Sequence, residues 1–223
     1  MNLKEIQEDL EAVDRSVIGI SGVARVGKDT FAEALIHLFT TEGFEAQRVA
    51  FADALKEDIN DFLLAKTGVN AYTSNTEEKA LLRPMLVEYG RLMRSLTDGQ
   101  YWINIVKEKI EKNTKNNIIS ILSDARYKNE MEWVNSQSHS ASIHLSRKGI
   151  EAANSEEEEN DPQAKLSANY SIHWRNCDSE KEVINQVEKY FYGLDLPSRF
   201  IRPRVNPADS GSKKLRRTPQ RIS

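Results

Sequence analysis

The stretch Gly22-Val-Ala-Arg-Val-Gly-Lys-Asp-Thr30 has the spacing G-x-x-x-x-G-K of a phosphate-binding P-loop. It places Asp29 where that motif normally has serine or threonine. A short apolar run, Val17-Ile-Gly-Ile20, precedes the loop, and after it apolar residues recur at helical spacing up to Gly43. A strand before the loop and a helix after it are the context that the motif requires. The alternative interpretation is a glycine turn in which Asp29 caps the helix.

The residue types of this loop suit a triphosphate and a metal ion. Glycines let the backbone turn so that successive amides point at phosphate oxygens, and Lys28 adds a charge for the β and γ phosphates. We expect ATP to be bound by Gly22, Arg25, Val26, Gly27, Lys28 and Thr30. A carboxylate beside phosphate oxygens repels them unless a cation lies between, so we expect Asp29, Thr30 and Asp124 to hold Mg²⁺.

Short apolar segments alternate with longer amphipathic ones along the chain. We expect strands at 17–20, 48–51, 117–122, 141–145 and 169–173, and helices at 3–12, 29–41, 53–64, 77–96, 101–112, 127–136 and 179–191. This alternation predicts an α/β fold with three layers, a parallel sheet flanked by helices on both faces.

Composition and charge limit the class of protein. The 223 residues are 39% hydrophobic and 29% charged, with one cysteine, Cys177, and no apolar run long enough to span a membrane. We therefore expect a soluble cytoplasmic protein without a disulfide. The formal charge is −3, but residues 197–223 hold eight Lys or Arg and one acid, which leaves 23 basic and 33 acidic side chains, a charge of −10, in residues 1–196.

Two segments depart from the alternating pattern. The acidic run 155–161 has a density of like charges that predicts a solvated, mobile loop. The segment 197–223 holds four of the six prolines and few large apolar residues, so we expect an unstructured basic tail. The predicted domains are then an N-terminal helix in 1–15, a P-loop domain at 16–196, and the tail.

Candidates for the acceptor side follow the strongest predicted strand. In an open parallel sheet, ligands bind beyond the carboxyl ends of the strands, which is where Asp124 and Arg126 fall. Arg126 offers a forked donor to a phosphate, and Glu130, one helical turn on, can pair with Arg126 and fix its direction. The alternative is a helix start whose aspartate caps and whose arginine lies in solvent.

The segment 78–102 and its neighbour Lys56 supply further candidates. The residues expected to bind the acceptor are Lys56, Arg83, Gly90, Arg94 and Trp102, with Arg91 as another basic group. The basic side chains can clamp a second phosphate, and the small Gly90 lets a base approach closely. A solvent-exposed position for each arginine and core packing for Trp102 are the alternatives.

Five segments in this order resemble the deoxynucleoside monophosphate kinases of tailed bacteriophages. They are Gly22 to Thr30, Phe51-Ala-Asp-Ala-Leu-Lys56, Arg83 to Trp102, Asp124-Ala-Arg-Tyr-Lys-Asn-Glu130 and His144-Leu-Ser-Arg-Lys-Gly149, within a similarity that runs from about 16 to 192. The resemblance implies an adenylate-kinase-like fold with a lid and helices that bind the monophosphate. It also implies Mg²⁺-dependent transfer of the ATP γ-phosphoryl group to a deoxynucleoside monophosphate, with dNDP and ADP as products, in the host cytoplasm if the protein is phage-encoded.

Carried over by position, the resemblance implies roles for particular residues. Lys28 and Asp29 would act with a catalytic cluster of Asp124, Arg126 and Glu130. Arg147 would be a lid arginine that closes over the phosphates, in a lid at about 147–168.

Two other functions agree with the same residues. One is a different small-molecule P-loop kinase, for thymidylate, a ribonucleotide or a coenzyme precursor. The other is a nucleic-acid-associated P-loop ATPase that grips phosphates through its basic tail. The acidic body makes nucleic acid an unexpected partner except through that tail, and the sequence leaves open whether the chain is a homodimer.

Overall fold

The computed structural model describes residues 15–200. The helix predicted at 3–12 and the tail beyond residue 200 lie outside the described residues. No helix within 15–200 has both the length and the apolar character that a membrane span requires.

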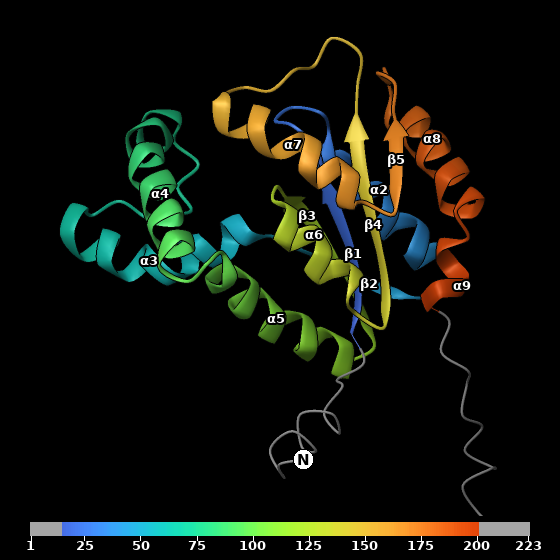
Figure 1. Cartoon of the computed structure of the whole chain (residues 1–223), viewed down its shortest axis with the longest axis horizontal. Coiled ribbons are helices and arrows are strands. Elements are labelled where there is room, and N and C mark those ends of the chain that lie inside the picture. Colours follow the sequence, from blue (N-terminus) through green and yellow to red (C-terminus); the bar gives the residue numbers. More distant parts are fainter. Residues whose placement is uncertain (1–14, 201–223) are drawn as a thin grey trace, which may run out of the picture.

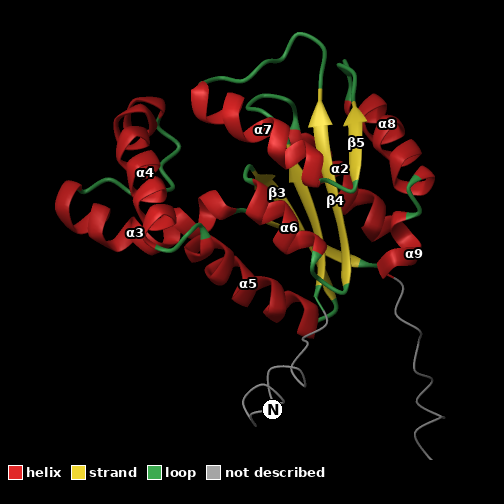
Figure 2. Ribbon diagram, in the orientation of Figure 1, coloured by secondary structure: helices red, strands yellow, loops and turns green. Residues whose placement is uncertain are grey.

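A five-stranded parallel sheet forms the centre of the molecule, and all five strands end at one edge (Figure 2). The strand order is β2-β3-β1-β4-β5. The strands are β1 Ser16–Ser21, β2 Glu45–Val49, β3 Ile118–Ala125, β4 His139–Ser146 and β5 Tyr170–His173. Every residue of β1 is buried, as expected of a short apolar strand at the centre of a parallel sheet.

Helices cover both faces of this sheet (Figure 1). One face packs against α2 Lys28–Thr41, α8 Glu180–Gly193 and α9 Leu196–Phe200. The other packs against α5 Gln100–Lys115, α6 Lys128–Asn135 and α7 Ser155–Ser167. The predicted three-layer α/β fold is therefore confirmed.

Two further helices form an arm beyond the β2–β3 side of the sheet (Figure 1). They are α3 Phe51–Thr67 and α4 Thr76–Leu96, and a small apolar cluster that includes Leu63 and Leu82 holds them together. This arm stands beside the carboxyl edge of the sheet, where the P-loop begins.

The predicted strand 48–51 and helix 53–64 are displaced in the structure. The strand ends at Val49, and α3 begins at Phe51. The reason is a distant cap: the carboxylate of Asp124 on β3 accepts the backbone amides of Phe51 and Ala52, each at 2.9 Å. These are free amides of the first turn, so the aspartate starts the helix there.

The acidic run 155–161 is helical, so the expectation of a mobile loop there is wrong. It forms the first half of α7, where the Asn154 side chain caps the helix by accepting the amide of Glu157 at 2.9 Å. Acidic side chains in a first turn are favoured by the helix dipole, which offsets their mutual repulsion.

The first residues assigned to the unstructured tail are helical, so that expectation is wrong for 197–200. Residues 197–200 belong to α9, and both Leu196 and Phe200 are buried against Phe39 and its neighbours in the core.

Candidate active site

The P-loop backbone needs glycine at both motif positions. Gly22 has φ +132°, and a Cβ on it would lie 2.4 Å from the carbonyl oxygen of Leu145. Gly27 has φ +101°, and its Cβ would lie 2.7 Å from the Trp174 ring. A residue with a side chain is disfavoured at both dihedral angles. The turns that join the loop to the preceding strand and to the following helix therefore need glycine.

Trp174, which no sequence pattern singled out, supports the loop from beyond β5. Its indole N–H donates to the carbonyl of Val26 at 2.7 Å, and its ring meets Phe31 edge to face. The Val26 side chain is fully buried in the core. The buried side chain cannot contact ATP, so Val26 could bind ATP only through its backbone.

Lys28 closes the loop on itself. Its ammonium donates to the carbonyls of Gly22 at 2.7 Å and Val23 at 2.9 Å. Burial lowers the pKa of Lys28, and Arg126 lowers it further, while Glu157 opposes the shift. The Lys28 ammonium therefore interacts with charges of both signs, on Arg126 and on Glu157.

Arg147 contacts the P-loop directly. It follows β4, and its guanidinium donates to the carbonyl of Arg25 at 2.6 Å. Arg25 is exposed and has φ +65°, at the turn of the loop. The resemblance predicts a lid at about 147–168, a range that includes α7. In the structure Arg147 braces the loop, and its lid role stays a prediction.

Asp29, at the start of α2, has two side-chain partners within residues 15–200. Its Oδ1 accepts from the Ser123 hydroxyl at 3.0 Å and from Arg48 at 3.2 Å, and Arg48 also pairs with Asp53 at 2.9 Å. Arg48 is a functional candidate that the sequence did not reveal, because it comes from β2. The Asp29 side chain is 68% exposed and Thr30 is exposed beside it. The carboxylate of Asp29 and the hydroxyl of Thr30 are oxygen ligands of the kind that Mg²⁺ prefers.

No group of three or more His, Cys, Asp or Glu in residues 15–200 is arranged to hold a metal ion. A magnesium ion here would take most of its ligands from phosphate and water, which is its usual habit. The metal roles predicted for Asp29, Thr30 and Asp124 stay predictions. Asp124 uses both carboxylate oxygens to cap α3, and burial raises its pKa against the opposing effect of the two amides.

Glu130 does not pair with the guanidinium of Arg126 as expected. Its Oε1 accepts from Arg94 at 2.6 Å, and its Oε2 accepts the backbone amides of Arg126 and Tyr127 at 2.8 and 3.1 Å. Arg94 also lies over the Tyr127 ring, 3.3 Å from its centre, and donates to Asn129 at 3.1 Å. Glu130 thus fixes the backbone at Arg126 and the side chain of Arg94.

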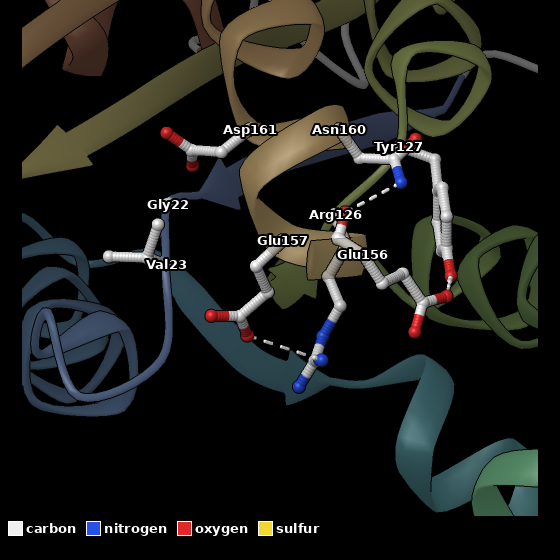
Figure 3. Close-up of a pocket in the computed structure, with 8 residues that line it drawn as sticks. All are labelled: Gly22, Val23, Arg126, Tyr127, Glu156, Glu157, Asn160 and Asp161. Atoms are coloured by element: carbon white, nitrogen blue, oxygen red, sulfur yellow. Dashed lines mark hydrogen bonds and ion pairs between the residues drawn. The ribbon is translucent and has the colours of Figure 1, made fainter. Parts of the chain in front are cut away.

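The first turns of α7 close over the P-loop. Glu157 accepts the amide of Ala24 at 3.1 Å and that of Ala153 at 3.0 Å, and its other oxygen lies 3.5 Å from Arg126. Glu156 bonds to the Tyr127 hydroxyl. Figure 3 shows Glu157 and Arg126 pointing toward one another in a small pocket between the loop and the helix. These glutamates stand in a uniform acidic run, so only the fold distinguishes them.

A cleft of about 660 Å³ runs from this point along the arm. Every predicted acceptor residue lines it: Lys56, Arg83, Gly90, Arg94 and Trp102. Asp124, Arg126 and Glu130 line its inner end, and Leu55, Leu82, Leu86 and Val87 give it an apolar wall. We call it the arm cleft.

Two of these residues also serve packing. Trp102 is buried and its indole donates to the Gly90 carbonyl at 3.1 Å. A Cβ on Gly90 would lie 2.8 Å from Leu55, so the small residue lets α3 and α4 approach. Arg83 makes no ion pair with any side chain in residues 15–200, which leaves its charge available in the cleft.

Two solved structures are similar to this chain over most of its length. The dephospho-CoA kinase from Campylobacter jejuni is 12% identical, with 82% of this chain and 98% of that one covered and a TM-score of 0.41. TT1252 from Thermus thermophilus is 13% identical, with 81% and 97% covered and a TM-score of 0.45. No protein-family model and no curated relative matches the sequence. Similarity at this level identifies neither a reaction nor an acceptor.

Proposed function

We propose that the protein is an ATP-dependent phosphotransferase that converts a deoxynucleoside monophosphate and ATP to a deoxynucleoside diphosphate and ADP. The donor half of this proposal rests on the P-loop. Gly22 and Gly27 are sterically required, and Lys28 lies within the loop they form. Such a loop at the start of a helix is an anion site, because its amides and the helix dipole both face the ligand.

The observation that carries the proposal is the position of Arg126. This arginine lines the pocket beside Gly22 and Val23, and it also lines the inner end of the arm cleft. A group that moves from a donor on the loop to an acceptor in the cleft passes this guanidinium. Its planar fork suits a phosphoryl group in transit.

The acceptor half rests on the arm cleft. Its lining combines basic side chains, among them Lys56 and Arg83, with the apolar wall and the aromatic Trp102. Basic groups fit a monophosphate, and an apolar wall with an aromatic edge fits a base. Gly90 keeps this wall close to α3.

The chemistry asked of these residues is modest. The acceptor phosphate oxygen attacks the γ-phosphorus of ATP, the bond to the β–γ bridging oxygen breaks, and ADP leaves with that oxygen. An anionic phosphate oxygen is already nucleophilic, so no general base is needed. Lys28 and Arg126 neutralise charge on the transferred group. Asp29 and Thr30 would hold Mg²⁺, which would screen the phosphate charges. Glu130 holds the backbone that carries Arg126.

A second candidate is a kinase for a phosphorylated coenzyme precursor. The size of the arm cleft, which continues to Thr73, Ser74 and Lys79, favours it, because an acceptor longer than a mononucleotide would also fit. The rival ATPase that acts on nucleic acid depends on the basic tail, which lies outside the described residues. The acceptor separates these candidates.

Replacing Arg126 tests the proposal. We expect Arg126→Ala to reduce phosphoryl transfer by about 10²-fold or more, since the transition state loses a positioned charge, while ATP still binds through the loop. Initial rates and ATP affinity are measured together, and Lys109→Ala, on the exposed face of α5, is the control. Transfer within a few-fold of wild type in Arg126→Ala would refute the role given to this arginine.

A further inference from the structure

Glu157 lies where the P-loop meets α7, and its carboxylate is bound by the groups that a phosphate would use. Ala24 is a loop residue, and its amide donates to Glu157 Oε2 at 3.1 Å. Arg126 lies 3.5 Å from Oε1. Figure 3 shows this carboxylate on the side of the pocket that Gly22 and Val23 line.

Burial makes these contacts informative. Glu157 is 9% exposed, although its neighbour Glu158 on the same helix is exposed. Hydrogen bonds from Ala153 and Ala24, followed by the charges of Arg126 and Lys28, hold the pKa of Glu157 below its usual range in spite of burial. The side chain is therefore a charged carboxylate at the phosphate site.

A helix cap alone does not explain this arrangement. Asn154 caps α7, and Glu157 stands three residues later, at the position from which a capping-box glutamate reaches back to the backbone of the capping residue. Here the carboxylate reaches instead to Ala153 and across to Ala24. One of its bonds thus serves the start of the helix, whereas the other joins the helix to the P-loop.

A carboxylate and a phosphate oxygen compete for the same donors. Both are anions that accept from backbone amides and from arginine, and two such anions a few ångströms apart repel each other. ATP that presents its terminal phosphate to Ala24 and Arg126 must therefore displace Glu157 from them.

We propose that Glu157 is an affinity-determining residue of the phosphate site, a resident carboxylate that occupies the Ala24 amide and Arg126 until the terminal phosphate of ATP displaces it. This inference rests on the proposed function and adds to it how the donor site is controlled. Displacement frees Arg126 for the transferred group and releases the first turn of α7 from the loop. A ligand too weak to displace the carboxylate is thereby excluded.

Glu157→Gln in the full chain tests the inference, with Glu158→Gln as the matched control. Both variants remove one negative charge from α7, but only Glu157→Gln removes a charge that contacts the P-loop. We expect the Kd for ATP, measured by titration calorimetry without an acceptor, to fall about tenfold or more in Glu157→Gln and to stay within about twofold of wild type in Glu158→Gln. An unchanged or higher Kd in Glu157→Gln would overturn the inference.

Amide exchange in the wild-type chain gives a second test that needs no variant. Added ATP should slow exchange in 22–30 and speed it in 153–158, because the loop gains a ligand while α7 loses its anchor. Slower exchange in both segments would mean that α7 closes with Glu157 in place, which contradicts displacement. Absence of ATP binding to all three proteins would overturn the proposed function and this inference with it. Binding to wild type with no gain in Glu157→Gln overturns the inference alone.

Discussion

Single residues of the site do more than one task, and Glu130 is the clearest case. It binds Arg94 and two backbone amides from a buried position, and burial raises its pKa to about 7 from the ordinary value of 4.5. Between these values the folded protein binds a proton that the unfolded chain releases. The stability contributed by this group therefore rises as the pH falls from about 7 toward 4.5, and the cost of the buried charge is complete above pH 7.

Comparison of wild type with Glu130→Gln isolates this effect. We expect the unfolding free energy of wild type, relative to the variant, to decline as the pH rises from about 5 to about 8. Denaturant unfolding of both proteins across that range measures it. A difference that stays constant with pH would show that Glu130 titrates near its ordinary value.

Residue roles could be predicted where a local motif fixes them and not where a distant segment does. Gly22, Gly27 and Lys28 follow from one short motif, and the structure gives the steric reasons for both glycines. Trp174, just after β5, and Arg48, on β2, reach the P-loop segment from distant parts of the chain. No spacing in the sequence connects them to it, so only the fold brings them together.

Most helices and strands were predictable in type, with α7 and α9 as exceptions, whereas their ends depended on contacts from far along the chain. The start of α3 illustrates this, because its cap, Asp124, lies more than seventy residues away. Asp124→Ala should lower the unfolding free energy by about 1–3 kcal/mol, since two amides of the first turn lose their acceptor. The measurement is made without Mg²⁺ or nucleotide, which separates capping from any metal role.

Asp61→Ala is the control for that experiment, because Asp61 is an exposed acid of the same helix. A loss in Asp124→Ala no larger than the loss in Asp61→Ala would contradict the capping role.

The helix α7 was also mispredicted, because contacts from outside the segment decide its structure. Its acidic composition favours a solvated loop locally, but Asn154, the helix dipole and the contact of Glu157 with Ala24 favour a helix.

At the scale of the whole molecule, the fold brings basic side chains together at the candidate site of an acidic protein. Residues 1–196 carry a formal charge of −10, so the protein is a poor general attractor of phosphates. The structure gathers Lys28, Arg48 and Arg126 at the carboxyl edge of the sheet and directs further basic groups into the arm cleft. Anion binding then depends on placed side chains and backbone amides. Binding through placed groups favours one kind of phosphorylated substrate over anions in general.

The identity of that acceptor tests the account most directly. Full-length protein is incubated with ATP and Mg²⁺ and, one at a time, with each deoxynucleoside monophosphate, each ribonucleoside monophosphate and a phosphorylated coenzyme precursor, and the products are separated by chromatography. We predict that at least one deoxynucleoside monophosphate yields its diphosphate and ADP in equal amounts. Formation of ADP and free phosphate alone, or phosphorylation of another acceptor with no deoxynucleoside diphosphate formed, would contradict the proposed function.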